Sequence, residues 1–129
     1  MERKYYISGI IFGLIALLIG AFGAHGLKPL LTFEALTTLE TGVKYQMYHA
    51  LLLILLGILY GNGHKFSKVI FYLLVIGVIL FSGSIYLLAT NDLTSLDFRT
   101  LALATPLGGS LLIISWAWLL VYFIKLKKK

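Results

Sequence analysis

Two histidines and two serines are the side chains of this sequence whose types could do chemistry within a largely apolar chain. His25 and His49 could bind a headgroup or carry a proton, because a free imidazole titrates at about pH 6.5. Ser82 and Ser84 could act as nucleophiles only with a base within hydrogen-bonding reach, and His49 is the candidate base. A serine and a histidine without further pattern are weak evidence for catalysis, so we assign no catalytic residue.

A metal site has still less support in the sequence. Zinc takes three or four protein ligands, whereas the chain has three histidines and no cysteine. No carboxylate lies inside the long uncharged stretches, and we expect His64, which stands beside Lys65, to be solvated. The sequence therefore predicts neither a metal nor a cofactor, and the lack of cysteine excludes disulfides and thiol chemistry.

Polar side chains occur in all four long apolar stretches, and in the topology predicted below they converge at one level. Tyr45 and Gln46 lie four and three residues before His49, so the three share one face of a helix. The helical rise places the set within about 10 Å of the outer interface. Two interpretations stay open, a hydrogen-bonded layer that closes the outer end of the bundle and a small polar pocket. The set comprises His25, Tyr45, Gln46, Tyr48, His49, Ser82, Ser84 and Thr105.

The elements that position these residues are membrane-spanning helices. The chain is 60% hydrophobic and 12% charged, whereas a soluble domain is about 45–50% apolar and about 25% charged. Insertion of a charged side chain at the centre of a spanning helix costs about 2.5–3.5 kcal/mol, so spans are expected to be free of charge. The sequence has four uncharged windows, at residues 5–27, 45–64, 69–91 and 100–124. We predict an all-α transmembrane four-helix bundle forming one domain, 1–129, with spans at about residues 5–25, 44–61, 69–90 and 105–124.

Two shorter features refine this prediction. Apolar residues of segment 33–43 recur every three or four positions after Thr32, a capping residue type. This pattern predicts a short amphipathic helix at the outer interface, either separate from the second span or continuous with it. The fourth span is predicted to begin at Pro106, with Thr105 as its cap, because proline suits the first position of a helix.

Small residues mark the faces on which the helices pack. In lipid, association depends on close approach of backbones and on interhelical hydrogen bonds. Gly77 in the third span and Gly108 in the fourth are such residues, and the first span has a continuous small stripe. That stripe serves either packing within the bundle or, as the alternative, a homo-oligomer interface. It comprises Gly9, Gly13, Ala16, Gly20 and Ala24.

Orientation follows from the distribution of Lys and Arg. Eight of them lie in the N-terminal tail, the second loop and the C-terminal tail, and three lie in the first and third loops. The positive-inside rule then places both termini in the cytoplasm. The Lys and Arg residues that give the net charge of +6 flank the apolar spans. They do not form a basic face with interleaved aromatic residues. We therefore expect the lipid bilayer, and no nucleic acid, as the partner.

Five motifs run from the first span to the last. They are residues 20–27 (GAFGAHGL), 45–49 (YQMYH), 81–87 (FSGSxYL), 105–109 (TPLGG) and Trp116. Together they resemble the YgdD/YwdK-type proteins, a family of small uncharacterised bacterial membrane proteins. The resemblance implies four spans in the cytoplasmic membrane, and it implies no activity, because none is assigned to the family.

The sequence thus favours a multi-pass membrane protein without enzymatic activity that interacts with lipid or assists assembly. One alternative is a small transporter or proton-linked permease that uses His25 and His49. It is disfavoured because no span contains a carboxylate for proton coupling. A second alternative is a membrane enzyme that acts on a lipid at the outer face.

Overall fold

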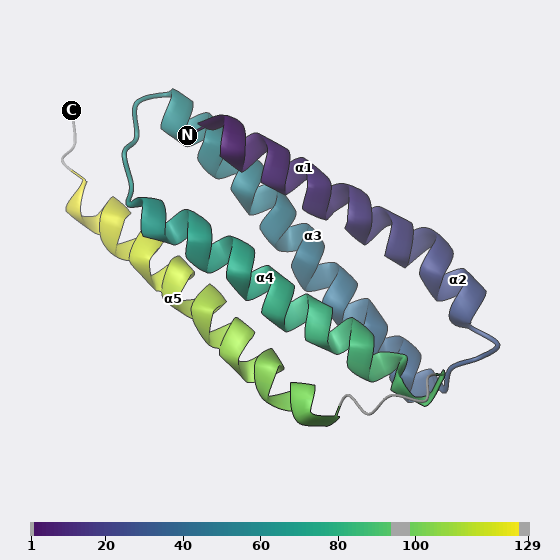
Figure 1. The fold of residues 1–129 in the computed structure, drawn as a ribbon. Helices are drawn as coiled ribbons and strands as arrows, with labels where there is room; N and C mark the ends of the chain where they lie inside the picture. Colours follow the sequence, from purple (N-terminus) through teal and green to yellow (C-terminus); the bar gives the residue numbers. More distant parts are fainter. Residues whose placement is uncertain (1, 94–98, 127–129) are drawn as a thin grey trace.

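Four long helices form the fold in the computed structural model, which describes residues 2–93 and 99–126 (Figure 1). The described residues contain no strand, and each of the four helical spans among them is long and apolar enough to cross a bilayer. These findings confirm the predicted all-α architecture. The helices are α1 (Glu2–Leu18), a π-helical turn (Ile19–Gly23), α2 (Ala24–Leu27), α3 (Phe33–Gly61), α4 (Lys68–Ala89) and α5 (Ala104–Lys125).

The amphipathic segment 33–43 is not a separate helix, because it forms the first turns of α3. Thr32 caps this helix as predicted, since its hydroxyl accepts a hydrogen bond from the backbone N–H of Ala35 at 3.1 Å. No proline lies between residues 33 and 61 to interrupt the backbone hydrogen bonds. α3 is therefore 29 residues long, or about 43 Å at the rise of an α-helix.

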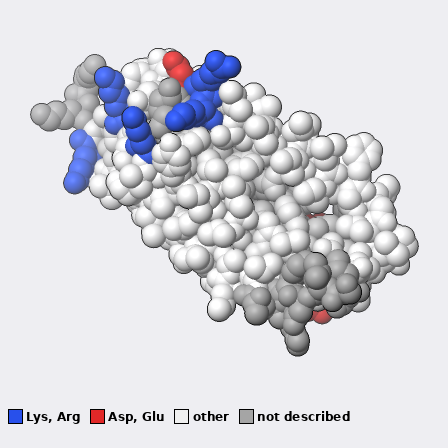
Figure 2. Space-filling model, in the orientation of Figure 1, with Lys and Arg blue, Asp and Glu red and all other residues white. Residues whose placement is uncertain are grey.

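The helices pack in chain order, with α1 on α3, α3 on α4 and α4 on α5. The first and last described residues lie at the same end of the bundle, and α2 lies at the opposite end (Figure 1). On the face drawn in Figure 2, the Lys and Arg side chains gather at the end that holds the chain termini. An even number of crossings places the two ends of the chain on one side.

Glycines allow the closest approaches between helices. A Cβ atom added at Gly9 would lie 2.7 Å from the carbonyl oxygen of Ala50, and one added at Gly20 would lie 3.1 Å from Val43. The small stripe of the first span therefore faces α3 within one chain; the side chain of Ala24 is outside the described part. Gly77 and Gly108 form a similar crossing of α4 and α5, because a Cβ added at Gly108 would lie 2.8 Å from the Gly77 carbonyl oxygen.

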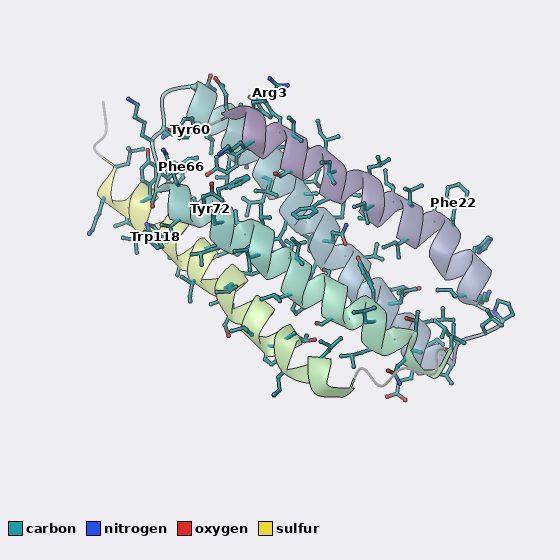
Figure 3. All side chains as sticks on the ribbon, viewed as in Figure 1. Arg3, Phe22, Tyr60, Phe66, Tyr72 and Trp118 are labelled. Atoms are coloured by element: carbon teal, nitrogen blue, oxygen red, sulfur yellow. The ribbon has the colours of Figure 1, made fainter. Side chains whose placement is uncertain are left out.

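An aromatic cluster fills the end of the bundle near the termini, where Tyr60 and Phe66 are labelled in Figure 3. Tyr5 is fully buried against both of these rings. The hydroxyl of Tyr122 accepts a hydrogen bond from the backbone N–H of Lys65 at 3.1 Å and lies 3.3 Å from Nδ1 of His64. The expectation of a solvated His64 is therefore wrong, because its loop folds across the end of α5.

Candidate functional site

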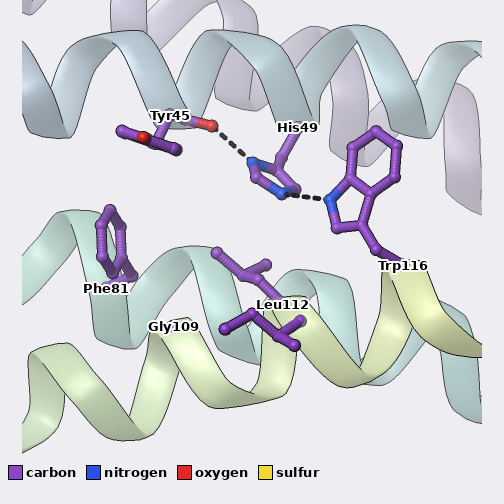
Figure 4. Close-up of a pocket in the computed structure, with 7 residues that line it drawn as sticks. Tyr45, His49, Phe81, Gly109, Leu112 and Trp116 are labelled. Atoms are coloured by element: carbon purple, nitrogen blue, oxygen red, sulfur yellow. Dashed lines mark hydrogen bonds between the residues drawn. The ribbon is translucent and has the colours of Figure 1, made fainter.

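His49 lies between α3 and α5 with both ring nitrogens hydrogen-bonded. Its Nδ1 is 2.7 Å from the carbonyl oxygen of Tyr45, and its Nε2 is 3.0 Å from Nε1 of Trp116 (Figure 4). A carbonyl can only accept and an indole N–H can only donate, so Nδ1 carries the proton and Nε2 accepts. This arrangement selects one neutral tautomer of His49, because a second proton, on Nε2, would face the indole N–H.

Gln46 connects three helices through its carboxamide. Its Nε2 donates to the carbonyl oxygen of Phe12 in α1 at 2.8 Å, and its Oε1 accepts from the hydroxyl of Tyr86 in α4 at 2.6 Å. The side chain of Gln46 is 4% exposed. A buried polar group without a partner is costly, so the two bonds hold α1 and α4 at defined positions on α3.

The two serines bond to groups other than His49. Ser82 donates to the carbonyl oxygen of Gly42 at 2.8 Å, and the hydroxyl of Ser84 lies 2.5 Å from that of Thr105. The prediction that Thr105 caps the fourth span is therefore wrong. α5 begins at Ala104 without a side-chain cap, because a 3₁₀ segment, Arg99–Leu103, leads directly into it.

His49 lies near the middle of α3, sixteen residues after Phe33 at its start and twelve before Gly61 at its end. The distance to Gly61 is about 18 Å of helical rise, as in the predicted span 44–61. The distance to the start of the helix is longer than in that span, because α3 begins at Phe33. Tyr45 and Tyr48 pack ring against ring, with centroids 5.7 Å apart, and are 44% and 55% exposed on the bundle surface.

A cavity of about 270 Å³ adjoins His49 between α3 and α5 (Figure 4). It has aromatic and aliphatic walls, and several of the lining side chains, Ile113 at 70% and Trp116 at 51%, are exposed on the outside of the bundle. The cavity is thus a recess in the surface that faces lipid. Its lining residues are Tyr45, His49, Phe81, Gly109, Leu112, Ile113 and Trp116.

His25 is not brought to His49. It lies exposed on α2 and lines another cavity, of about 430 Å³, which is also lined by Lys28 and Thr37 and by Glu40 of α3. The predicted polar set therefore does not converge at one place, because His25 and His49 line different cavities. Among the described residues, no group of three His, Asp or Glu side chains is placed to hold a metal ion.

Tyr86, which bonds to Gln46, and Trp116, which bonds to His49, were not among the predicted site residues. They appeared only as parts of the motifs 81–87 and Trp116. A phenol O–H or an indole N–H within an apolar span has no water to bond to, so it needs a partner from the protein. That requirement is a signal in the sequence that could have indicated both residues, although it could not have named their partners.

The fold and the buried hydrogen bonds define a small multi-pass α-helical membrane protein. A family described as a protein of unknown function, DUF423, matches residues 19–109. The UPF0382 membrane protein YwdK of Bacillus subtilis is 38% identical, with 95% of this chain and 98% of YwdK covered. The UPF0382 inner membrane protein YgdD of Escherichia coli is 37% identical, with 99% of this chain and 95% of YgdD covered.

A UPF0382 membrane protein of Staphylococcus saprophyticus is 36% identical, with 96% of this chain and 99% of that protein covered. The chain therefore belongs to the DUF423 (UPF0382) family of membrane proteins of unknown function. This finding confirms the resemblance to YgdD and YwdK drawn from the motifs. No solved structure matches the chain.

Proposed function

We propose that this protein is a non-enzymatic membrane protein that interacts with lipid, and that its buried polar side chains hold the helices together. The observation that carries the proposal is that these side chains are hydrogen-bonded to backbone carbonyl groups and to one another. Nucleophilic catalysis needs a nucleophile with a base in reach, but Ser82 and Ser84 bond to other groups and both nitrogens of His49 are engaged.

The positions of the carboxylates argue against a proton-linked permease. Ionisable side chains in the membrane mark the proton path of such transporters. Within the described helices α1 to α5, the acidic residues are Glu2, in the first turn of α1, and Glu34 and Glu40, near the start of α3. The neutral tautomer of His49 is also occupied on both sides, so it offers no free nitrogen to a proton carrier.

The recess between α3 and α5 is where we propose that an acyl chain packs. The hydrocarbon core contains no water to fill it, and the walls are mainly apolar. In lipid, van der Waals packing is a principal source of association. An acyl chain of a neighbouring lipid would complete this packing against Phe81, Leu112 and Ile113.

Filling the recess tests this proposal. A Cβ at Gly109 would lie 3.5 Å from the Phe81 ring, which is ordinary contact, so Gly109→Leu should occupy the recess without displacing the backbone. In a Trp118→Phe background, Trp116 is the remaining tryptophan, and lipids brominated along their chains should quench its fluorescence. We expect Gly109→Leu to reduce this quenching.

Gly83→Leu is the matched control, because no atom lies within 4 Å of a Cβ added at Gly83. It should leave the quenching of Trp116 unchanged. Equal quenching in the Gly109→Leu variant and its parent would contradict the acyl-chain proposal. Solute or proton flux through liposomes containing the protein, or turnover of a labelled lipid, would contradict the non-enzymatic, non-transporting role.

We also propose a bacterial cytoplasmic membrane location with both termini in the cytoplasm. The clustering of Lys and Arg at the end of the bundle that holds the termini supports this orientation (Figure 2) through the positive-inside rule. The name of the Escherichia coli relative, an inner membrane protein, supports the location.

A further inference from the structure

We propose that the cavity between the π-helical turn, α2 and the start of α3 binds a phospholipid whose headgroup carries a primary ammonium, as in phosphatidylethanolamine. The cavity has a volume of about 430 Å³, within the range of about 300–1,000 Å³ that is usual for small-molecule sites. It shares no lining residue with the recess beside His49. This proposal therefore stands apart from the acyl-chain site between α3 and α5.

The charges that line this cavity have opposite signs and come from different helices. Lys28 follows α2 directly, His25 lies on α2, and Glu40 lies on α3. Within the described part of the chain, these three side chains form no hydrogen bond or ion pair with the protein. A cation and an anion that lack protein partners and line one cavity are complementary to a zwitterion.

The zwitterion that fits is a phosphate linked to a primary ammonium. Lys28 can pair with the phosphate as a compact positive charge, and the carboxylate of Glu40 can accept a charge-assisted hydrogen bond from an ammonium N–H. A trimethylammonium group has no N–H to donate. A purely anionic headgroup would leave the Glu40 carboxylate without a partner and close to a like charge.

A smaller and more apolar cavity indicates that the ligand is a whole lipid. It has a volume of about 190 Å³ and shares Gly20 and Glu40 with the larger cavity. Leu39 and Val43 form its apolar wall, and Lys44 also lines it. Phe33, at the rim of the larger cavity, is 86% exposed. Apolar walls that begin beside charged ones suit an amphipathic molecule with its headgroup among the charges and its chain against Val43.

The π-helical turn Ile19–Gly23 provides an independent indication of function at this place. Single π-helical turns within α-helices are rare and are frequent at functional sites. Gly20 lies in this turn and lines both cavities, whereas Phe22 is 74% exposed and points away from the bundle (Figure 3). The turn thus carries an apolar side chain on its outer surface and a cavity on its inner one.

Lipid binding to the delipidated full-length protein tests the proposal. Native mass spectrometry would compare phosphatidylethanolamine, phosphatidylcholine and phosphatidylglycerol with identical acyl chains. We expect phosphatidylethanolamine to bind about ten-fold more tightly than phosphatidylcholine, the size of one hydrogen bond to a charged group. Glu40→Gln should remove this preference, and Lys28→Gln should weaken the binding of all three phospholipids.

Glu34→Gln is the matched control, because Glu34 is an exposed carboxylate in the first turn of α3 that does not line the cavity. It should leave every affinity unchanged. Equal binding of phosphatidylethanolamine and phosphatidylcholine would overturn the proposal, as would a Glu40→Gln variant that melts normally and keeps the preference. If glycerophosphoethanolamine displaced bound phosphatidylethanolamine at an equal concentration, the site would be assigned to a soluble ligand instead of a lipid. Gly109→Leu should not alter the preference, which separates this site from the recess.

Discussion

Trp116 donates its indole N–H to Nε2 of His49 across 3.0 Å, and the two rings stand nearly perpendicular at 83°. Helix α5 packs mainly on α4, so this bond reaches past α4 to α3. It forms one wall of the recess between α3 and α5 and selects the tautomer of His49. This one hydrogen bond therefore both connects α5 to α3 and helps to shape the surface that faces lipid.

Replacing Trp116 by Phe should destabilise the protein by about 1 kcal/mol, since bonds of this kind within membranes contribute up to about 1.7 kcal/mol. The variant leaves Nε2 of His49, a 4% exposed residue, without its donor. Unfolding in mixed micelles would measure the difference. Trp118→Phe, which removes an indole that has no hydrogen bond in the described structure, should cost less. In a His49→Leu background, Trp116→Phe should cause little further loss of unfolding free energy. Equal losses of unfolding free energy in the two backgrounds would show that the hydrogen bond does not form.

Replacing Gln46 by Met should cost more than replacing Tyr86 by Phe. Methionine removes the donor to Phe12 and leaves the Tyr86 hydroxyl without its acceptor, and an unsatisfied buried group costs about 1–3 kcal/mol. In the Gln46→Met background, Tyr86→Phe should then be neutral or stabilising. A double-mutant cycle in unfolding free energy would check this coupling. Strictly additive losses would show that the two side chains do not interact.

Replacing Gly108 by Ala should separate α5 from α4. The added methyl group would meet the backbone of Gly77 and Leu80 at 2.8 and 2.9 Å, and overpacking of this kind costs about 1–3 kcal/mol. Gly83→Ala adds the same group in open space and should be close to neutral. Melting temperatures of the two variants in detergent would test the crossing, and similar values would mean that the helices do not approach so closely.

Cysteine labelling can test the proposed orientation without background, because the chain has no cysteine. Glu34→Cys at the start of α3 should react with an impermeant maleimide in intact cells whose outer layers the reagent can pass. Asn62→Cys, at the opposite end of α3, should react only after the cytoplasmic membrane is opened. Both positions are exposed in the structure. The reverse pattern would place the termini outside.

The sequence was sufficient to predict four helices long and apolar enough to cross a membrane. Charge inside hydrocarbon is costly wherever it occurs, so uncharged stretches identify the spans from local composition alone. The cap at Thr32 was also predictable, because its partner, Ala35, lies three residues away. Gly9 and Gly20 were recognisable as packing residues, because the small size of glycine is known from the sequence without knowledge of its neighbours in the fold.

Tertiary structure alone decided which polar groups meet. Gln46 bonds to Phe12, 34 residues earlier, and His49 to Trp116, 67 residues later; such pairs depend on the rotation and axial position of whole helices. A shift of one residue turns a side chain by about 100° around its helix and would break these bonds. The same geometry separates His25 from His49, because α3 begins eleven residues earlier than the span assigned from the charges.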